Sequence, residues 1–309
     1  MSQKDNKNSL TNGELAAIFR RFLDRYARRN SLSNDAKEQL DEELGASLSV
    51  VPRNDHVFGV LERTIGKNTK RAEASIFLYA ALSQISACHQ RIVERIGDPT
   101  YDVRAMVVQL IGQKKWRHLA HLLNPLMVGD PDPRIVDHAI YSAGELLSSI
   151  NLPVLLELAS RDLQEPSEFR SRLLWALREY REPTAEAYFR ANLIPLENFD
   201  RPFDSRKEHA VLAAWALLKL GPDDDASRLL IRMLDDPPTK YSWPGGGGSD
   251  GGVSLRAAQA LCDIFAIRFN WSMKYLPRIR QSLRDLGLPV PLDIPKERNI
   301  TLEHPAALS

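Results

Sequence analysis

The chain has 309 residues, of which 43% are hydrophobic and 26% are charged, as in ordinary soluble globular proteins. Its 41 Lys and Arg residues nearly balance its 40 Asp and Glu residues, so the formal net charge is only +1. This balance excludes a surface that is basic throughout and built for nucleic acid or an anionic membrane, although it permits a local basic stripe.

The termini and cysteines indicate a cellular compartment. Residues Met1–Asn8 are polar and lack the apolar core of a signal peptide. The longest apolar run, Ala210–Leu218, is far shorter than the ~20 residues that span a bilayer. Cys88 and Cys262 lie in apolar helical stretches, which favours buried free thiols over a disulfide. We therefore expect a cytoplasmic protein without a membrane segment.

The first predicted helix begins at Thr11, which forms a capping box with Glu14. Apolar residues then recur at helical spacing from Leu15 to Tyr26, and arginines occupy the opposite face. A second helix is expected over residues 33–46. The sequence contains no sustained apolar–polar alternation and no hairpin signal between β-branched runs, so we expect an all-α fold.

From about residue 70 the chain becomes repetitive. Gly97-Asp98-Pro99 and Gly129-Asp130-Pro131 lie 32 residues apart, and Gly112 matches Gly144 at the same offset. In both copies we expect the aspartate to cap a helix whose first residue is the proline. Looser copies follow over residues 165–177, 205–218 and 254–261.

A second set of predicted helices alternates with these first helices. They cover residues 115–127, 153–160, 184–193, 223–234 and 272–286. The chain is thus predicted to form helix pairs at a spacing of 32 to 44 residues. Because one such pair cannot bury its apolar face alone, the pairs are expected to stack into a continuous core.

This pattern resembles the HEAT repeat. The resemblance rests on Asp98-Pro99 followed by Asp102-Val103-Arg104-Ala105 and Leu110, and on Leu255-Arg256-Ala257-Ala258. It covers roughly residues 70–286 and is strongest over 97–145. It implies a right-handed α-solenoid of about five to six HEAT-like helix pairs, whose second helices line the concave side. The sequence departs from the pattern at Val136, where the arginine that follows Val103 has no counterpart.

Three segments are expected on this basis. Residues 1–69 form an N-terminal helical cap or small bundle, residues 70–287 form the repeat solenoid, and residues 288–309 form a proline-rich C-terminal tail. A glycine-rich insertion over 237–252 interrupts the solenoid. Its glycines match the spacing of a dinucleotide fingerprint, but the segment follows a helix rather than a strand, so we expect an interhelix loop.

Catalytic and metal-binding motifs are missing from the sequence. His118, His121 and His138 could approach one another across stacked helices, but no His-Glu-x-x-His, Glu-x-x-His or paired-cysteine motif accompanies them. No Gly-x-Ser-x-Gly elbow is present. The acidic run over 223–225 stands where a helix should begin, and capping explains it. We predict no catalytic residue, no metal site and no cofactor.

The predicted second helices carry a series of arginines. If these helices line a concave surface, the arginines face an anionic partner, whereas interspersed acids such as Glu157 and Glu186 leave intramolecular pairing as the alternative. The candidate partner-binding residues are Arg117, Arg161, Arg190, Arg228, Arg232 and Arg278, together with Trp243 of the glycine-rich insertion.

These features predict a non-enzymatic scaffold that grips a partner protein on its concave helical surface, as a toxin-neutralising immunity-type protein or an adaptor. The alternative is nucleic-acid binding, because some HEAT-like proteins are DNA glycosylases with a cationic groove. The chain resembles those enzymes in repeat type only, and the matching Trp-Ala-Leu contexts of Trp175 and Trp215 indicate core positions. Other enzymes, such as a repeat-type lyase, and the oligomeric state are left open.

Overall fold

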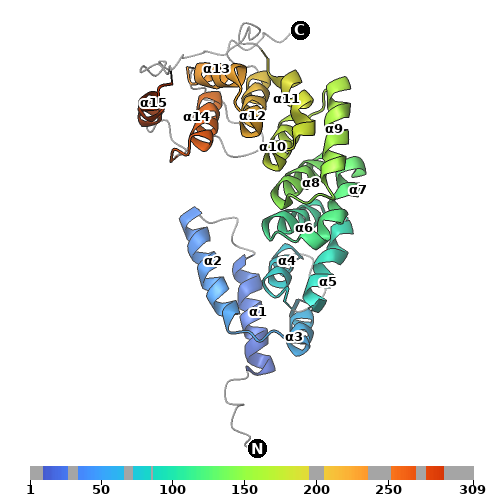
Figure 1. Cartoon of the computed structure of the whole chain (residues 1–309). Helices are drawn as coiled ribbons and strands as arrows, with labels where there is room; N and C mark the ends of the chain where they lie inside the picture. Colours follow the sequence, from blue (N-terminus) through green and yellow to red (C-terminus); the bar gives the residue numbers. More distant parts are fainter. Residues whose placement is uncertain are drawn as a thin grey trace, which may run out of the picture. The chain divides into compact units, whose positions relative to one another are not determined.

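The structure is a computed structural model that describes residues 10–26, 34–65, 72–84, 86–194, 205–235, 252–268 and 276–288. Within these ranges the chain forms fifteen α-helices and no β-strand (Figure 1). The predicted all-α class is therefore confirmed. None of the described helices is long and apolar enough to cross a membrane. The chain divides into two compact units, residues 1–142 and 143–309.

Unit 1 holds the N-terminal helices and the first repeats. Its helices are α1 (Asn12–Tyr26), α2 (Asn34–Ser49), α3 (Asp55–Ile65), α4 (Ala72–Ala81), α5 (Ser86–Glu94), α6 (Tyr101–Gln113), α7 (Leu123–Gly129) and most of α8 (Pro133–Leu146). The short 3-10 helices are η3 (Arg95–Gly97) and η4 (Arg117–Leu122). Helix α1 packs against α3 and α4, and α4 packs against α5 and α6. The N-terminal helices therefore share their core with the first repeat-like helices.

Helix α1 begins with the predicted capping box. The backbone amide of Thr11 donates to the carboxylate of Glu14 at 2.7 Å, and the amide of Glu14 donates to Thr11 Oγ1 at 3.3 Å. This reciprocal pairing satisfies two amides that the helix itself cannot. The residues that α1 buries completely are Leu15, Phe19, Phe22 and Leu23.

The two Gly-Asp-Pro turns differ from the prediction. Asp98 Oδ1 accepts a hydrogen bond from the amide of Thr100, and Asp130 Oδ1 accepts one from the amide of Asp132, both at 2.9 Å. An aspartate bonded to the amide two residues later closes a turn of its own. Helix α6 therefore begins at Tyr101 and α8 at Pro133, and the prediction that Asp98 and Asp130 cap these helices is wrong.

Unit 2 is built from two rows of helices (Figure 1). Its helices are α9 (Leu152–Gln164), α10 (Arg170–Tyr180), α11 (Glu186–Asn192), α12 (Ser205–Leu220), α13 (Asp224–Met233), α14 (Gly252–Ile264) and α15 (Leu276–Asp285), with the 3-10 helix η5 (Pro183–Ala185). Helix α12 packs between α10 and α14, while α9, α11 and α13 pack against this row. Residues 210–217 of α12 are all buried, so α12 is the centre of the unit.

Matching glycines allow successive first helices to approach closely. A Cβ atom at Gly112 of α6 would lie 2.9 Å from the Cα atom of Ser142 on α8. A Cβ atom at Gly144 of α8 would lie 2.9 Å from the Cα atom of Ala176 on α10. Real Cβ atoms do not approach backbone so closely, so these two positions require glycine. The 32-residue offset thus marks a repeated helix–helix joint.

The turns after several first helices share a left-handed residue that the sequence did not reveal. The residues are Lys115 (φ 54°), Leu147 (φ 51°), Arg181 (φ 52°) and Ala266 (φ 53°). After α6 the amide of Trp116 donates to the carbonyl of Ile111 at 3.0 Å, and after α14 the amide of Ile267 donates to that of Cys262 at 2.8 Å. This is the Schellman ending, which satisfies carbonyls at a helix C-terminus.

Candidate partner-binding site

Three of the predicted arginines form ion pairs with nearby acids. The pairs are Arg161–Glu157, Arg190–Glu186, Arg190–Asp223 and Arg228–Asp225. All three guanidinium groups are exposed, and each has a carboxylate about one turn away on the same helix. Such pairs are typical of a solvated helix face and reduce the positive charge that the face presents.

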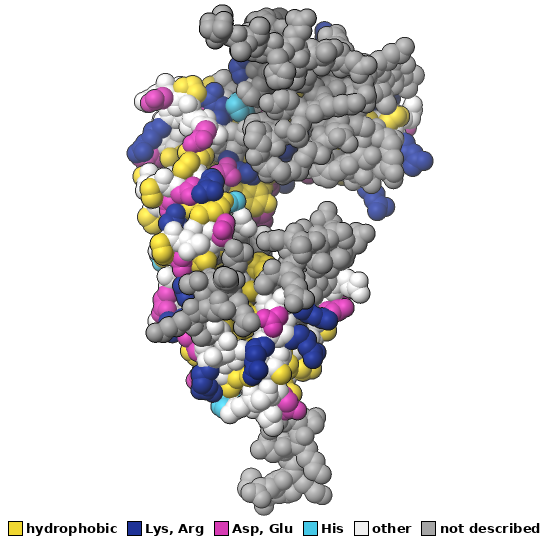
Figure 2. All heavy atoms as spheres, turned by 180° about the vertical axis from the view of Figure 1, so that it is seen from behind, with side chains coloured by type: hydrophobic (Ala, Val, Ile, Leu, Met, Phe, Trp, Pro, Cys, Tyr) yellow, Lys and Arg dark blue, Asp and Glu magenta, His cyan; other side chains and the backbone are white. Residues whose placement is uncertain are grey.

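The other predicted residues are placed differently. Arg117 of η4, Arg232 of α13 and Arg278 of α15 are exposed, and no acid in the described ranges forms an ion pair with them. Trp243 lies outside the described residues, as do residues 237–251 of the insertion and 289–309 of the tail. Basic and acidic side chains alternate over the described part of the face in Figure 2. A mixed surface favours a protein partner over a phosphate backbone.

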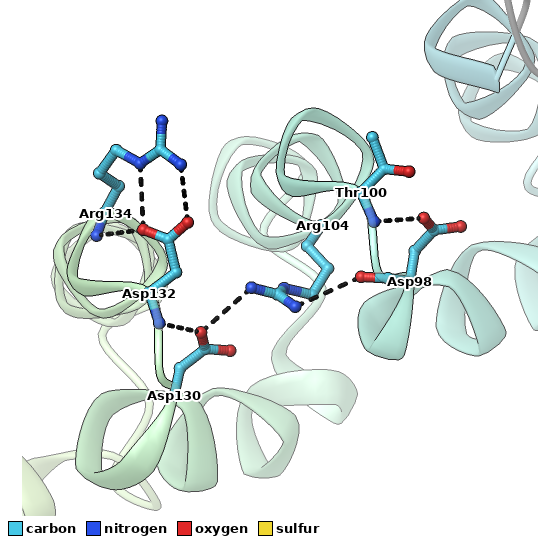
Figure 3. A network of polar contacts seen from close by, with 6 residues as sticks. All are labelled: Asp98, Thr100, Arg104, Asp130, Asp132 and Arg134. Carbon is cyan, nitrogen blue, oxygen red and sulfur yellow. Dashed lines mark hydrogen bonds and ion pairs between the residues drawn. The ribbon is translucent and has the colours of Figure 1, made fainter.

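The structure brings together a second set of exposed side chains, on two successive first helices of unit 1. Tyr101 opens α6 and Arg134 lies in the first turn of α8. The guanidinium carbon of Arg134 lies 3.7 Å from the centroid of the Tyr101 ring, a cation–π contact. The carboxylate of Asp132 holds the same guanidinium through Nε at 3.0 Å and Nη2 at 2.8 Å (Figure 3). Arg134 is therefore fixed from two directions although its side chain is 62% exposed.

Two further side chains complete this surface. Tyr101 Oη lies 3.1 Å from Nε2 of His138, and Nε2 of Gln109 lies 3.2 Å from Nδ1 of the same ring. Burial raises the pKa of Tyr101, although Arg134 opposes the effect, so the phenol keeps its proton and remains a donor. We call Tyr101, Gln109, Arg134 and His138 the α6/α8 cluster.

A joint between the two Asx turns positions the α6/α8 cluster. Arg104 of α6 donates to the backbone oxygen of Asp98 at 3.4 Å and to the carboxylate of Asp130 at 3.2 Å (Figure 3). The same oxygen of Asp130 accepts the amide of Asp132, and Asp132 holds Arg134. The position of Arg134 is thus linked to the contact between the two helix pairs.

This arrangement suits a contact with another protein. Tyrosine and arginine are enriched among the residues that dominate protein interfaces. Side chains that are already held in place lose little conformational entropy on binding. Asp132 occupies two of the N–H groups of Arg134, and a guanidinium has five, so donors remain for a carbonyl or carboxylate of a partner.

A second polar network lies inside unit 2 and is structural. Arg178 of α10 is 4% exposed, and its guanidinium carbon lies 3.6 Å from a ring centroid of Trp215 on α12. Trp215 Nε1 donates to Asp263 of α14 at 2.8 Å, and Nζ of Lys219 lies 3.0 Å from the same carboxylate. The network joins three first helices around a buried indole. It confirms the prediction that Trp215 is a core residue.

The histidines considered as metal ligands are divided between two places. His138 belongs to the α6/α8 cluster, whereas His118 contacts His89 of α5. In the part of the chain that the structure describes, no group of three or more His, Cys, Asp or Glu side chains could hold a metal ion.

Sequence reasoning missed the α6/α8 cluster because it looked for charge on the second helices. Tyr101 and Arg134 lie one repeat plus one residue apart, and this spacing was the available signal. No protein-family model matches the chain, and no curated protein matches its sequence.

Proposed function

We propose that this chain is a non-enzymatic, HEAT-like repeat scaffold that binds a partner protein. In this proposal the alternating helices form a right-handed solenoid of about five to six pairs, with the N-terminal helices as a cap. The repeated glycine joints and the two rows of helices in unit 2 support it. A cytoplasmic immunity-type or adaptor protein is the biological form that we propose.

The rigid and exposed Tyr101–Arg134 stack is the observation that carries this proposal. An exposed arginine normally moves freely, yet this one is held by both a carboxylate and a ring. Pre-organisation of this kind favours binding because the cost of ordering the side chain is already met in the free protein. We propose that the α6/α8 cluster is the centre of the interface and that the exposed arginines of the second helices contribute at its edge.

Nucleic-acid binding is the second candidate, and a different observation favours it. Arg117, Arg232 and Arg278 are exposed and have no ion-pair partner among the described acids. Arginines of this kind are available to contact phosphates, and such contacts make affinity fall steeply as salt rises.

Affinity purification of the tagged chain from its native cells, with and without nuclease, tests the proposal. We expect one protein to be recovered near stoichiometrically in both samples. Recovery of nucleic acid, or of proteins that nuclease removes, would instead support the second candidate. Turnover of a substrate that a single side-chain substitution abolishes would contradict the non-enzymatic assignment.

A further inference from the structure

Two imidazoles from different elements of unit 1 meet at their ring nitrogens. His89 lies on α5 and His118 on η4, and their Nε2 atoms are 2.9 Å apart. The edge of Trp116 contacts the His89 ring, with the ring centroids 5.1 Å apart. Nδ1 of His121 lies 3.1 Å from the backbone oxygen of His118 and braces the turn that carries it. Both histidines are thus held in a defined geometry.

The separation of these nitrogens matches a pair of metal ligands. Imidazole nitrogens bind Cu²⁺, Ni²⁺ and Zn²⁺ at about 2.0–2.1 Å. At that distance two nitrogens 2.9 Å apart subtend about 90° at the ion. This is the angle between neighbouring ligands in square-planar and octahedral coordination, whereas tetrahedral zinc needs a separation of about 3.3–3.4 Å. The geometry therefore favours Cu²⁺ or Ni²⁺.

The surroundings leave room for the rest of a coordination shell. The side chain of His118 is exposed and that of His89 is partly exposed, so water can reach the nitrogens. Because the described residues hold no third His, Cys, Asp or Glu ligand at this place, the protein supplies two ligands and solvent supplies the others. In the absence of an ion, one Nε2 atom donates its proton to the other.

We propose that His89 and His118 form a binding site for one divalent late transition-metal ion of the Cu²⁺ or Ni²⁺ class. The ion replaces the proton shared by the two rings and links α5 to η4. This site is separate from the α6/α8 cluster and does not depend on the proposed partner binding.

Titration of the full-length chain with Ni²⁺, followed by calorimetry, tests the site. We expect one ion per chain. His89→Gln and His118→Gln should each weaken binding about tenfold or more, because a single imidazole loses the advantage of a chelating pair. His121→Gln is the matched control, since His121 lies on the same turn but uses Nδ1 for a backbone contact, and it should bind as the unsubstituted chain does.

Electron paramagnetic resonance of the Cu²⁺-loaded chain provides a second readout. The spectrum should show two equivalent nitrogen ligands, reduced to one in either glutamine variant. Cu²⁺ at this site should also quench the fluorescence of the adjacent Trp116, and Trp116→Phe should remove that part of the quenching. Ni²⁺ affinity that is the same in the unsubstituted chain and in both glutamine variants would overturn the proposal and leave only a hydrogen-bonded histidine pair.

Discussion

Arg104 of α6 reaches the carboxylate of Asp130, at the end of α7, over a distance of 3.2 Å. This contact links one helix pair to the next, because Asp98 and Asp130 occupy matching places in successive repeats. Val136 stands where the next repeat would carry an equivalent arginine, so the joint after it is built differently. There Asp162, 32 residues after Asp130, accepts hydrogen bonds from Ser167 and Arg170 instead.

Loss of Asp130 should destabilise the chain strongly. The side chains of Asp130 and Arg104 are 5% and 16% exposed. Asp130→Ala removes the Asx turn and leaves a mostly buried guanidinium unpaired, so we expect the free energy of unfolding to fall by about 3 kcal/mol. Urea denaturation measures this loss. The control is Asp225→Ala, which removes an exposed acid from its pair with Arg228 and should cost about 0.5 kcal/mol or less. Equal losses in the two variants would contradict the assigned joint.

Gly144 should not tolerate a side chain. A Cβ atom there would lie 2.6 Å from Cζ3 of Trp175 as well as close to the backbone of α10. We expect Gly144→Ala to lower the free energy of unfolding by about 2–3 kcal/mol, because the packed helices must move apart. Gly45→Ala in α2 is the matched control. Nothing lies within 4 Å of that position, so alanine should stabilise the helix by up to about 1 kcal/mol. Thermal unfolding of both variants decides the point.

The sequence predicted the local elements better than their joints. Helix α1 followed from its capping box and apolar spacing, and the offset of Gly112 and Gly144 followed from simple repetition. The single helix predicted over 115–127 was wrong, since it is divided into η4 and α7. Pro125 offers a physical reason, because it has no amide for the hydrogen bond that would continue the helix.

Other features depend on contacts between distant residues, which one sequence does not display. Helix α3 was not predicted, because its only buried residues are Val57, Val60 and Leu61 and it relies on packing against α1. The α6/α8 cluster needed the measured distance between two helices. The boundary proposed at residue 69 stays a prediction, although α1 and α4 from its two sides pack together.

Glycine should be favoured where first helices end in a left-handed residue. Ala266 has φ 53° and is exposed, so Ala266→Gly relieves backbone strain without losing a side-chain contact. We expect a gain of about 0.5–1 kcal/mol in the free energy of unfolding. The opposite sign is expected for Ala17→Gly, at an exposed position inside α1, where glycine should cost about 1 kcal/mol. A loss at both positions in chemical denaturation would contradict the left-handed assignment.

Asp162 should make stability depend on acid pH. Burial alone would raise the pKa of this carboxyl, but hydrogen bonds from Ser167, Arg170 and Tyr188 outweigh it and hold the pKa below its ordinary value. A carboxyl with a lowered folded pKa stabilises the protein above its unfolded pKa, near 3.9, and loses that contribution as pH falls through the folded value. The free energy of unfolding should therefore fall below about pH 4.

Asp162→Asn tests that assignment. The variant should be less stable at neutral pH by about 3 kcal/mol, because an amide cannot accept all of the hydrogen bonds that the carboxylate accepts. Its stability should also change less between pH 5 and pH 3 than that of the unsubstituted chain. Denaturation curves recorded at several pH values measure both effects, and identical pH dependence in the two proteins would assign the acid sensitivity to other carboxyl groups.

Partner recovery by three tagged forms of the chain tests the central claim most directly. The forms are the unsubstituted protein, Arg134→Ala and Arg161→Ala, each shown by circular dichroism to be folded. Both arginines are exposed and ion-paired, but only Arg134 stacks on a neighbouring aromatic ring in the α6/α8 cluster. We predict that Arg134→Ala loses most of the recovered partner protein, as expected for an interface residue worth about 2 kcal/mol, while Arg161→Ala retains it. Full recovery by Arg134→Ala would contradict a partner-binding role for the α6/α8 cluster.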